Sequence, residues 1–330
     1  MLKRKKQVSI IALICITALL FVSGCGNNAS DQQADAGSNY PEKDITLIIP
    51  FTAGGSSDVQ ARIVEKYFKD EFGVNLVFMY KEGAGGEIGW TELANAEPDG
   101  YTIAGFNDPH ILLQPLARET AFTYESFDYI GMMVKEPQLI VVSKDSPYNT
   151  FEELLAAIKE NPGGLTCGLS GSYSGHHITA LKLMDAADCE FTLVPYNGSA
   201  DQIVALQGGH IDFIVGNPGD LTPDAEKYKF LAIADEERGS YLPDTPTLIE
   251  LGYDVTNSIS RGFATPVGVD PAILERLQKG FENIANNPDY LADMAAIGQL
   301  ADWTHGEDLK SVYAEDSELY KALLEEYATE

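Results

Sequence analysis

Two short stretches rich in glycine and serine carry the clearest chemistry in this sequence. Residues 52–57 read TAGGSS and precede Asp58, and residues 170–175 read SGSYSG and precede two histidines. Glycine lets the backbone approach a ligand closely, and a loop that opens a helix leaves free N–H groups pointing outward. Such loops bind anions. The alternative interpretation is a plain strand-to-helix turn that binds nothing.

Neither stretch matches a nucleotide-binding motif. The pattern is not Gly-x-Gly-x-x-Gly, nor Gly-x-x-x-x-Gly-Lys followed by Ser or Thr, and no lysine follows the glycines of residues 52–57. A nucleotide phosphate is therefore not the expected ligand.

Side chains that could act as a nucleophile and a base occur near the second loop, as Ser172 or Ser174 with His177. A catalytic triad also needs an orienting acid and an oxyanion hole, and no Gly-x-Ser-x-Gly elbow is present. Asp58 is better interpreted as a helix cap that accepts from backbone N–H groups than as a general base. We therefore predict that the chain is not an enzyme, and that Ser174 and His177 donate to a ligand or to the loop.

The histidines do not have the spacing of a metal site. His176 and His177 are adjacent, so they diverge by about 100° on a helix, unlike a pair four residues apart. The others stand alone in the sequence: His110, His210 and His305. We predict no metal and no cofactor.

Each small-residue loop lies between a predicted strand and a predicted helix. The apolar run 45–49 precedes the first loop and a helix follows from Asp58, while strand 165–169 and helix 177–184 flank the second loop. Two such units facing each other would bring two helix N-termini to one ligand.

Strands and helices alternate through the first hundred residues after residue 40, which indicates a parallel sheet covered by helices. Ligands of such sheets bind beyond the carboxyl ends of the strands, so the loops there matter most. The predicted strands are 45–49, 75–80, 101–106, 127–134, 138–143, 165–169, 191–195, 211–215 and 230–234. The predicted helices are 58–68, 90–96, 151–160, 177–184, 201–206, a short one that opens at 243–247 and ends at Gly252, then 271–286, 288–297 and 307–327.

The N-terminus has the pattern of a lipoprotein export signal. Four basic residues precede the apolar run 8–22, and small residues lead to Cys25. We expect cleavage before Cys25, lipidation of its thiol, and a polar tether over residues 25–39. The alternative is an uncleaved anchor with an incidental cysteine. The protein is then expected to be exported and anchored to the cell membrane.

The acidic balance excludes one class of partner. The formal net charge is −28, and removal of the four basic residues of the signal would take it to −32. Nucleic-acid binding needs a basic surface, so no nucleic acid is expected. Screening limits the reach of surface charge to about 8–10 Å, so an anionic ligand is still compatible. Cys167 and Cys189 could form a disulfide outside the membrane or remain two free thiols.

Several motifs together resemble one family. They are Tyr40-Pro41; Pro50-Phe51-x-Ala53-Gly54-Gly55-x-x-Asp58; Gly83-Ala84-Gly85-Gly86-Glu87-Ile88-Gly89; Pro98-Asp99-Gly100-Tyr101-Thr102; Ser170-Gly171 with Ser174 and His177; Val194-Pro195-Tyr196-x-Gly198; Gly208-Gly209-x-x-Asp212; Pro243 to Thr247 with Glu250 and Gly252; and Gly262-Phe263-Ala264-Thr265-Pro266. In this order the chain, from about residue 40 to 330, resembles the solute receptors of tripartite tricarboxylate transporters, often called Bug receptors. Two positions depart from the family near the expected cleft: Tyr173, where glycine is usual, and Ser260, near a usual aromatic residue.

The resemblance implies an α/β, two-domain, periplasmic-binding-protein-like fold of type II. Each domain would be a mostly parallel sheet flanked by helices, with two crossings between domains. The expected division is a signal peptide at 1–24, a tether at 25–39, domain 1 at 40–140 and 263–330, and domain 2 at 141–262. The domains would close on a small organic carboxylate, held partly through water.

The expected ligand-binding residues come from the loops and strand ends that face this cleft. They are Phe51, Thr52, Ala53, Gly54, Gly55, Ser56, Asp58, Asn107, Ser170, Gly171, Ser172, Ser174, His177, Asn197, Gly198 and Asn217. Arg261 would either meet a second ligand carboxylate or pair with an acid of the chain. The resemblance implies a monomeric receptor that delivers its ligand to membrane transporter subunits; the alternative is a sensory module of the same fold that signals to a membrane regulator.

Overall fold

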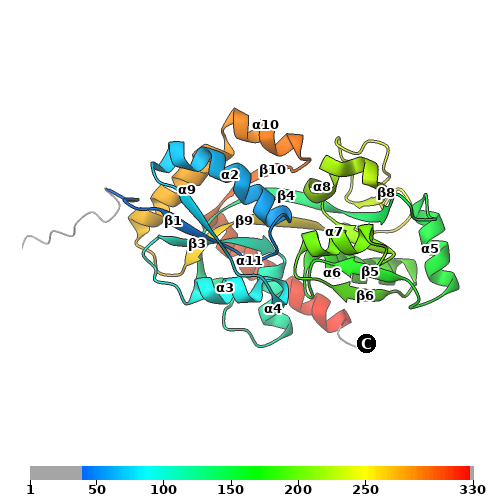
Figure 1. The fold of residues 1–330 in the computed structure, drawn as a ribbon. Coiled ribbons are helices and arrows are strands. Elements are labelled where there is room, and N and C mark those ends of the chain that lie inside the picture. Colours follow the sequence, from blue (N-terminus) through cyan, green and yellow to red (C-terminus); the bar gives the residue numbers. More distant parts are fainter. Residues whose placement is uncertain (1–38, 328–330) are drawn as a thin grey trace, which may run out of the picture. The chain divides into compact units, whose positions relative to one another are not determined.

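Ten strands form the sheet of the computed structural model, which describes residues 39–327 (Figure 1). The predicted signal peptide and Cys25 lie outside the described residues, and so does nearly all of the predicted tether. Among the described residues, none of the helices has both the length and the apolar character that a membrane span requires.

One part of the sheet, sheet A, combines parallel and antiparallel pairs. Strand β1 (Ile45–Ile49) lies between β2 (Leu76–Tyr80) and β3 (Thr102–Asp108) and is parallel to both, as predicted. Strand β9 (Ser258–Pro266) pairs antiparallel with β3, and β4 (Phe127–Ser143) pairs antiparallel with β9. Strand β10 (Ala301–His305) also pairs with β4.

The other part, sheet B, uses the second half of β4. There β4 pairs antiparallel with β7 (Phe213–Gly216) and β8 (Tyr228–Ala234). Strand β5 (Thr166–Leu169) is parallel to β7 and to β6 (Thr192–Pro195). The predicted parallel arrangement therefore holds for three strands in each sheet, and antiparallel strands join the two groups.

The sequence predicts two strands at 127–134 and 138–143, but the structure has the single strand β4. Pro137 suggested a break because proline donates no backbone hydrogen bond. In the structure Pro137 pairs with Ser258 at the start of β9, next to Gln138, the first residue that pairs with β8. Proline is tolerated at this point because β4 changes partners there.

Helices cover both faces of sheet A (Figure 1). Residues of α2 (Ser56–Phe72), α9 (Pro271–Ala285) and α10 (Pro288–Ala296) pack in one buried apolar cluster with β1, β4 and β9. Residues of α3 (Glu87–Ala94), α4 (His110–Ala117) and α11 (Gly306–Tyr327) pack in another on the opposite face.

Sheet B is covered in the same way. Helices α5 (Phe151–Glu160) and α6 (Gly175–Ala187) share one apolar cluster with β5 and β7, and α7 (Ser199–Gln207) shares another with the short helix α8 (Pro218–Leu221). Thr150 caps α5, since its side chain accepts from the Glu153 N–H. Cys167 and Cys189 are both free.

One predicted helix is absent from the described residues, and several observed elements were not predicted, among them α4 and β10. The short helix expected at 243–252 is a series of turns, because Thr247 bridges to Ile233 of β8 and the backbone around it bonds to that strand. Helix α4 was not predicted, since Pro115 lies inside it. Strand β10 was not predicted either, because its sequence, ADWTH, offers few apolar residues.

Candidate functional site

The first small-residue loop follows β1 and opens α2, as expected. Gly55 is the N-cap residue, and the Gly54 N–H donates to the Asp58 carboxylate at 2.8 Å. Asp58 is therefore inside the first turn of α2 rather than at the cap, although its side chain does accept from a backbone N–H. The Ser56 N–H donates to Ser199 Oγ at 3.3 Å, and Thr52 Oγ1 donates to Asp201 at 3.1 Å.

The second loop follows β5 and opens α6. Ser174 is the N-cap residue, and its Oγ accepts from the His177 N–H at 3.1 Å. The His177 ring accepts in turn from the Tyr173 N–H at 3.0 Å, and the His176 ring accepts from the Ser170 N–H at 3.2 Å. In these bonds the side chains of Ser174 and His177 are acceptors within the loop, whereas the sequence predicted that they donate to the loop or to a ligand.

Burial keeps both histidines neutral. It lowers the pKa of His176 to about 4, and it also lowers the pKa of His177. Each ring then has one N–H and one acceptor nitrogen. Two backbone N–H groups of this loop therefore donate to imidazole nitrogens rather than to water.

Ser174→Ala is expected to destabilise the protein by about 0.5–2 kcal/mol, because it removes the side-chain cap of α6. Thermal and denaturant unfolding of the purified variant measure this effect. Ser174→Asn is the matched control, since asparagine also caps helices. The interpretation as a cap is wrong if the alanine variant unfolds at the wild-type midpoint.

A directed chain of hydrogen bonds connects the two loops. Because His176 Nδ1 accepts from Ser170, its Nε2 carries the proton and donates to Asn217 Oδ1 at 3.0 Å. Asn217 Nδ2 donates to Ser56 Oγ at 3.0 Å, and Ser56 Oγ donates to the Asp220 carboxylate. The chain runs from the start of α6, through Asn217 after β7, to the start of α2.

The first loop also lies against the start of α7. A Cβ atom placed on Gly55 would be 2.8 Å from Ser199 Oγ, and one on Gly198 would be 3.3 Å from the Thr52 nitrogen. The second loop instead lies against residues 83–86, where a Cβ on Gly171 would be 2.9 Å from Gly85 Cα. Three helix N-termini, those of α2, α6 and α7, therefore converge on one region.

Two other predicted residues are placed differently. Asn107, in β3, is buried and accepts from Ser57 Oγ at 3.2 Å, so it lies beside α2. Asn197 is exposed and lines a hollow of about 460 Å³ with Asp201 and His210. The structure thus brings together the loops, Asn107, Gly198 and Asn217, with Asn197 at an outer edge.

His110 is a buried side chain that sequence reasoning left out. Its ring is fully buried, at 5.8 Å from the ring of Phe51 and 6.4 Å from that of Trp90, centre to centre. Neither ring nitrogen has a partner among the described residues, and burial lowers its pKa to about 3. Its position just after β3, at the carboxyl end of a parallel strand, was the available signal.

Arg261 has one of the two contacts predicted for it, an ion pair with an acid of the chain. It forms a buried ion pair with Glu136, and Glu136 also accepts from the Gly219 N–H at 3.0 Å. The Nε and Nη1 atoms of Arg261 have no partner among residues 39–327. The guanidinium is therefore held by an acid of the chain.

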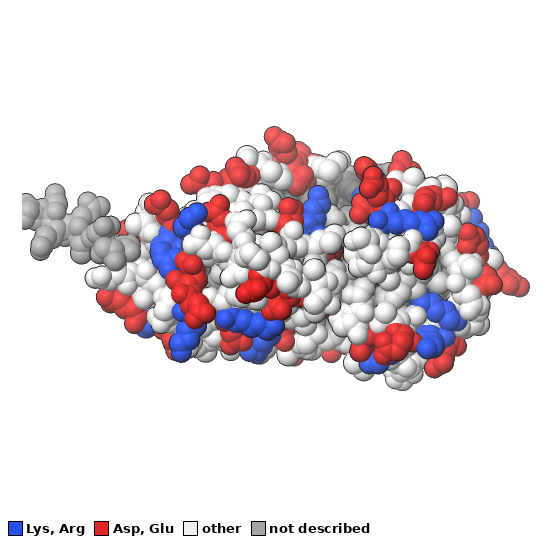
Figure 2. All heavy atoms as spheres, turned by 90° about the horizontal axis from the view of Figure 1, so that it is seen from above, with Lys and Arg blue, Asp and Glu red and all other residues white. Residues whose placement is uncertain are grey.

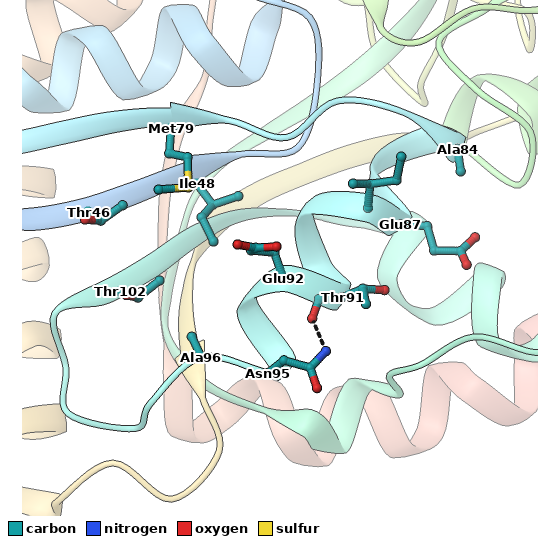
Figure 3. Close-up of a pocket in the computed structure, with 11 residues that line it drawn as sticks. Thr46, Ile48, Met79, Ala84, Glu87, Thr91, Glu92, Asn95, Ala96 and Thr102 are labelled. Atoms are coloured by element: carbon teal, nitrogen blue, oxygen red, sulfur yellow. Dashed lines mark hydrogen bonds between the residues drawn. The ribbon is translucent and has the colours of Figure 1, made fainter.

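A separate hollow of about 520 Å³ lies between α3 and strands β1 to β3 (Figure 3). Ile48 and Met79 point into it from the strands, and Glu87, Glu92 and Asn95 line it from the helix. It contains none of the predicted ligand-binding residues, and its charged groups are acids. We therefore do not assign the carboxylate site to it.

The described residues contain no cluster of three or more His, Cys, Asp or Glu side chains arranged to hold a metal ion. On the face seen in Figure 2, lysines and arginines lie interspersed among the more numerous acids, without a continuous basic surface.

The fold and the convergent loops define a class, that of the periplasmic binding proteins. The structure superimposes on that of the periplasmic binding protein BugD with a TM-score of 0.82 and 27% identity, covering 88% of this chain and 99% of the other. It also resembles MatC from Rhodopseudomonas palustris with bound malate, with a TM-score of 0.79 and 23% identity over 86% and 100% of the two chains. The predicted fold class is confirmed.

Residues 60–328 match the family model described as tripartite tricarboxylate transporter family receptor, and the chain belongs to this family. A relative from Cupriavidus necator, described as a UPF0065 protein in the gbd 5' region, is 30% identical over 96% of each chain. Family and fold are those of extracytoplasmic solute-binding receptors, which are not enzymes.

Proposed function

We propose that this protein is a lipid-anchored receptor that binds a small organic carboxylate between its two sheets and delivers it to a tripartite membrane transporter. The observation that carries the proposal is the convergence of the α2, α6 and α7 N-termini, joined through His176, Asn217 and Ser56. MatC, of similar fold, binds malate. Membership of the receptor family supports the transporter as the partner.

Helix N-termini favour a carboxylate for a physical reason. Each carries a partial positive charge, which stabilises an anion by about 0.3–1 kcal/mol, and by up to about 2 kcal/mol in partly buried sites. Tyr173, at the second loop, has a φ of 55°, and its ring is 5.7 Å from that of His177.

We further propose that sheet A and sheet B belong to separate domains. The sequence-based bounds are 40–140 with 263–330 and 141–262; the strand pairing moves the two divisions by a few residues, to Pro137 in β4 and to Ser258 at the start of β9. Strand β4 and the chain leading into β9 would be the two crossings. The change of β4 partners near Pro137 supports a hinge at this position. Ligand would then bring the α2 loop and the α6 and α7 loops together.

Native mass spectrometry of the protein purified without denaturation tests ligand binding. We expect a bound acid that is released unchanged on unfolding. Isothermal titration with the recovered acid should give one site per chain. Recovery of a chemically altered acid would indicate an enzyme, and the absence of binding to any small acid would contradict the proposal.

Labelling cells with a radioactive fatty acid tests the anchor. Wild-type protein should take up label, and Cys25→Ala should not, because the thiol of Cys25 is the predicted acylation site. Fractionation alone is less decisive, since an uncleaved signal would also hold the variant in the membrane. Wild-type protein without label would contradict the lipid anchor but not the binding function.

A further inference from the structure

The carboxyl group of Asp220 lies among the three converging helix N-termini. Its Oδ2 atom accepts from Ser56 Oγ, at the first turn of α2, and from Asn217 Nδ2 at 3.1 Å. Ser199, at the start of α7, also helps to stabilise the carboxylate. Asp220 therefore ends the hydrogen-bond chain that begins at α6, in the region proposed for the ligand.

One oxygen of this carboxylate has no donor. Asp220 Oδ1 is buried and has no hydrogen-bond partner among residues 39–327. Leaving a buried carboxyl oxygen without a donor destabilises the folded protein, so its presence calls for a partner. Asp220 therefore has donors to Oδ2 and none to Oδ1 among the described residues.

Asp220 forms no ion pair with a lysine or arginine of residues 39–327, and its pKa shows no effect of a neighbouring charge. Arg261 is paired with Glu136 through Nη2, while its Nε and Nη1 have no partner among these residues. His176, linked through Asn217, is kept neutral by burial. The other titratable groups facing this region are the acids Asp58 and Asp201 and the phenol of Tyr228.

We propose that Asp220 makes this receptor selective for small acids that carry a protonated amine beside the carboxylate, the amino acid class. The amine would donate to Asp220 Oδ1 while the carboxylate accepts from the helix N-termini. A ligand with carboxylates alone would place like charges together in a buried site, which is unfavourable. This inference rests on the proposed function and adds the chemistry of the second ligand group.

His110 is consistent with the same ligand class. Its neutral ring offers one donor and one acceptor, both unused, beside Phe51. A neutral ring adds no positive charge beside Phe51 and so does not repel a protonated amine.

Matched ligand pairs that differ only in the amine test the proposal. The pairs are glycine with acetate, alanine with propionate, aspartate with succinate, and glutamate with glutarate, titrated calorimetrically into the purified protein. For the pair that fits the site, the amino acid should bind roughly 10- to 100-fold more tightly than its partner, as expected for a charge-assisted hydrogen bond.

Asp220→Asn should remove this preference while the protein stays folded. Asparagine keeps the size and the acceptor oxygen but not the charge, so affinity for the amino acid should fall roughly 10- to 100-fold and that for its partner should not. Asp224→Asn is the control: it makes the same charge change nearby, where Asp224 forms an exposed ion pair with Lys227. Asp220→Ser serves if the asparagine variant does not fold.

The pH dependence gives an independent readout. Burial raises the pKa of Asp220 in the free protein. A bound amine favours the carboxylate, so binding should lower that pKa and release protons at pH values near it. Titrations in buffers of different ionisation enthalpy should detect this release in the wild type, and not in Asp220→Asn. The preference for the amino acid should also fall as the solution is acidified through the raised pKa.

The outcomes separate the two proposals. Two results would contradict the role of Asp220 but not the receptor function. One is that, in the pair that binds, the acid without the amine binds more tightly than the amino acid. The other is that the only ligand recovered from the purified protein is an acid without an amine. If none of the four pairs binds, the ligand recovered from the purified protein is the test. A ligand with an amine supports the role of Asp220, and a ligand without one contradicts it. If no small acid is recovered or bound at all, both proposals fail.

Discussion

Glu136→Ala is expected to destabilise the protein by about 3–5 kcal/mol, because it leaves the guanidinium of Arg261 buried and unpaired. Glu136 and Arg261 have 0% and 1% of their side-chain surfaces exposed, and burial lowers the pKa of Arg261. The Gly219 N–H would lose its acceptor as well. Denaturant unfolding followed by circular dichroism measures the loss, and wild-type stability in the variant would contradict it.

A double variant distinguishes the effect of losing the ion pair from the effect of losing side-chain volume. Glu136→Leu with Arg261→Met replaces the ion pair by apolar groups of similar size, and such exchanges in other proteins are often neutral or stabilising. We expect the double variant to recover most of the stability that Glu136→Ala loses. Glu136→Gln is the intermediate case, since it keeps an acceptor oxygen for Arg261 but removes its charge. Equal destabilisation by all three changes would indicate a packing effect instead.

Local features of the structure were predictable from the sequence. Strand β1 and helix α5 have the predicted bounds, and the glycine loops do connect strands to helices where expected. These features depend on neighbours in the chain: apolar runs, capping residues such as Thr150, and glycines that end or open elements.

The partners of each loop were not predictable. Ser56 and Asp220 are 164 residues apart in the chain, and Thr52 and Asp201 are 149 apart. Such pairs depend on how the two sheets are placed, which no local pattern encodes. The sequence predicted that the first loop would face the second, whereas the structure places it against α7 and links it to α6 through Asn217.

The roles of buried polar side chains were also hard to predict, because they depend on residues that are distant in the chain. His110 looked isolated in the sequence, and Asp220 was one of 50 acids. Their significance comes from burial without a partner, which is a property of the folded chain. Arg261 was left between two roles, and only its distant neighbour Glu136 decided between them.

Gly55→Val is expected to weaken ligand binding strongly while the protein stays folded. Gly55 has a φ of −84°, an extended conformation open to any residue, so valine adds no backbone strain. Its Cβ, however, would lie 2.8 Å from Ser199 Oγ and 3.5 Å from the Ala200 nitrogen. Overpacking of this kind costs about 1–3 kcal/mol, or roughly 5- to 150-fold in affinity if the contact forms only in the closed state.

Two alanine substitutions test whether a side chain at position 55 acts through its contact with Ser199. Gly55→Ala adds only the Cβ atom, and Ser199→Ala removes the Oγ atom that this Cβ would meet, so the double variant should bind more tightly than Gly55→Ala alone. Isothermal titration with the recovered ligand measures each affinity, and circular dichroism checks the fold. A folded Gly55→Val protein with wild-type affinity would show that the α2 loop and α7 do not close over the ligand.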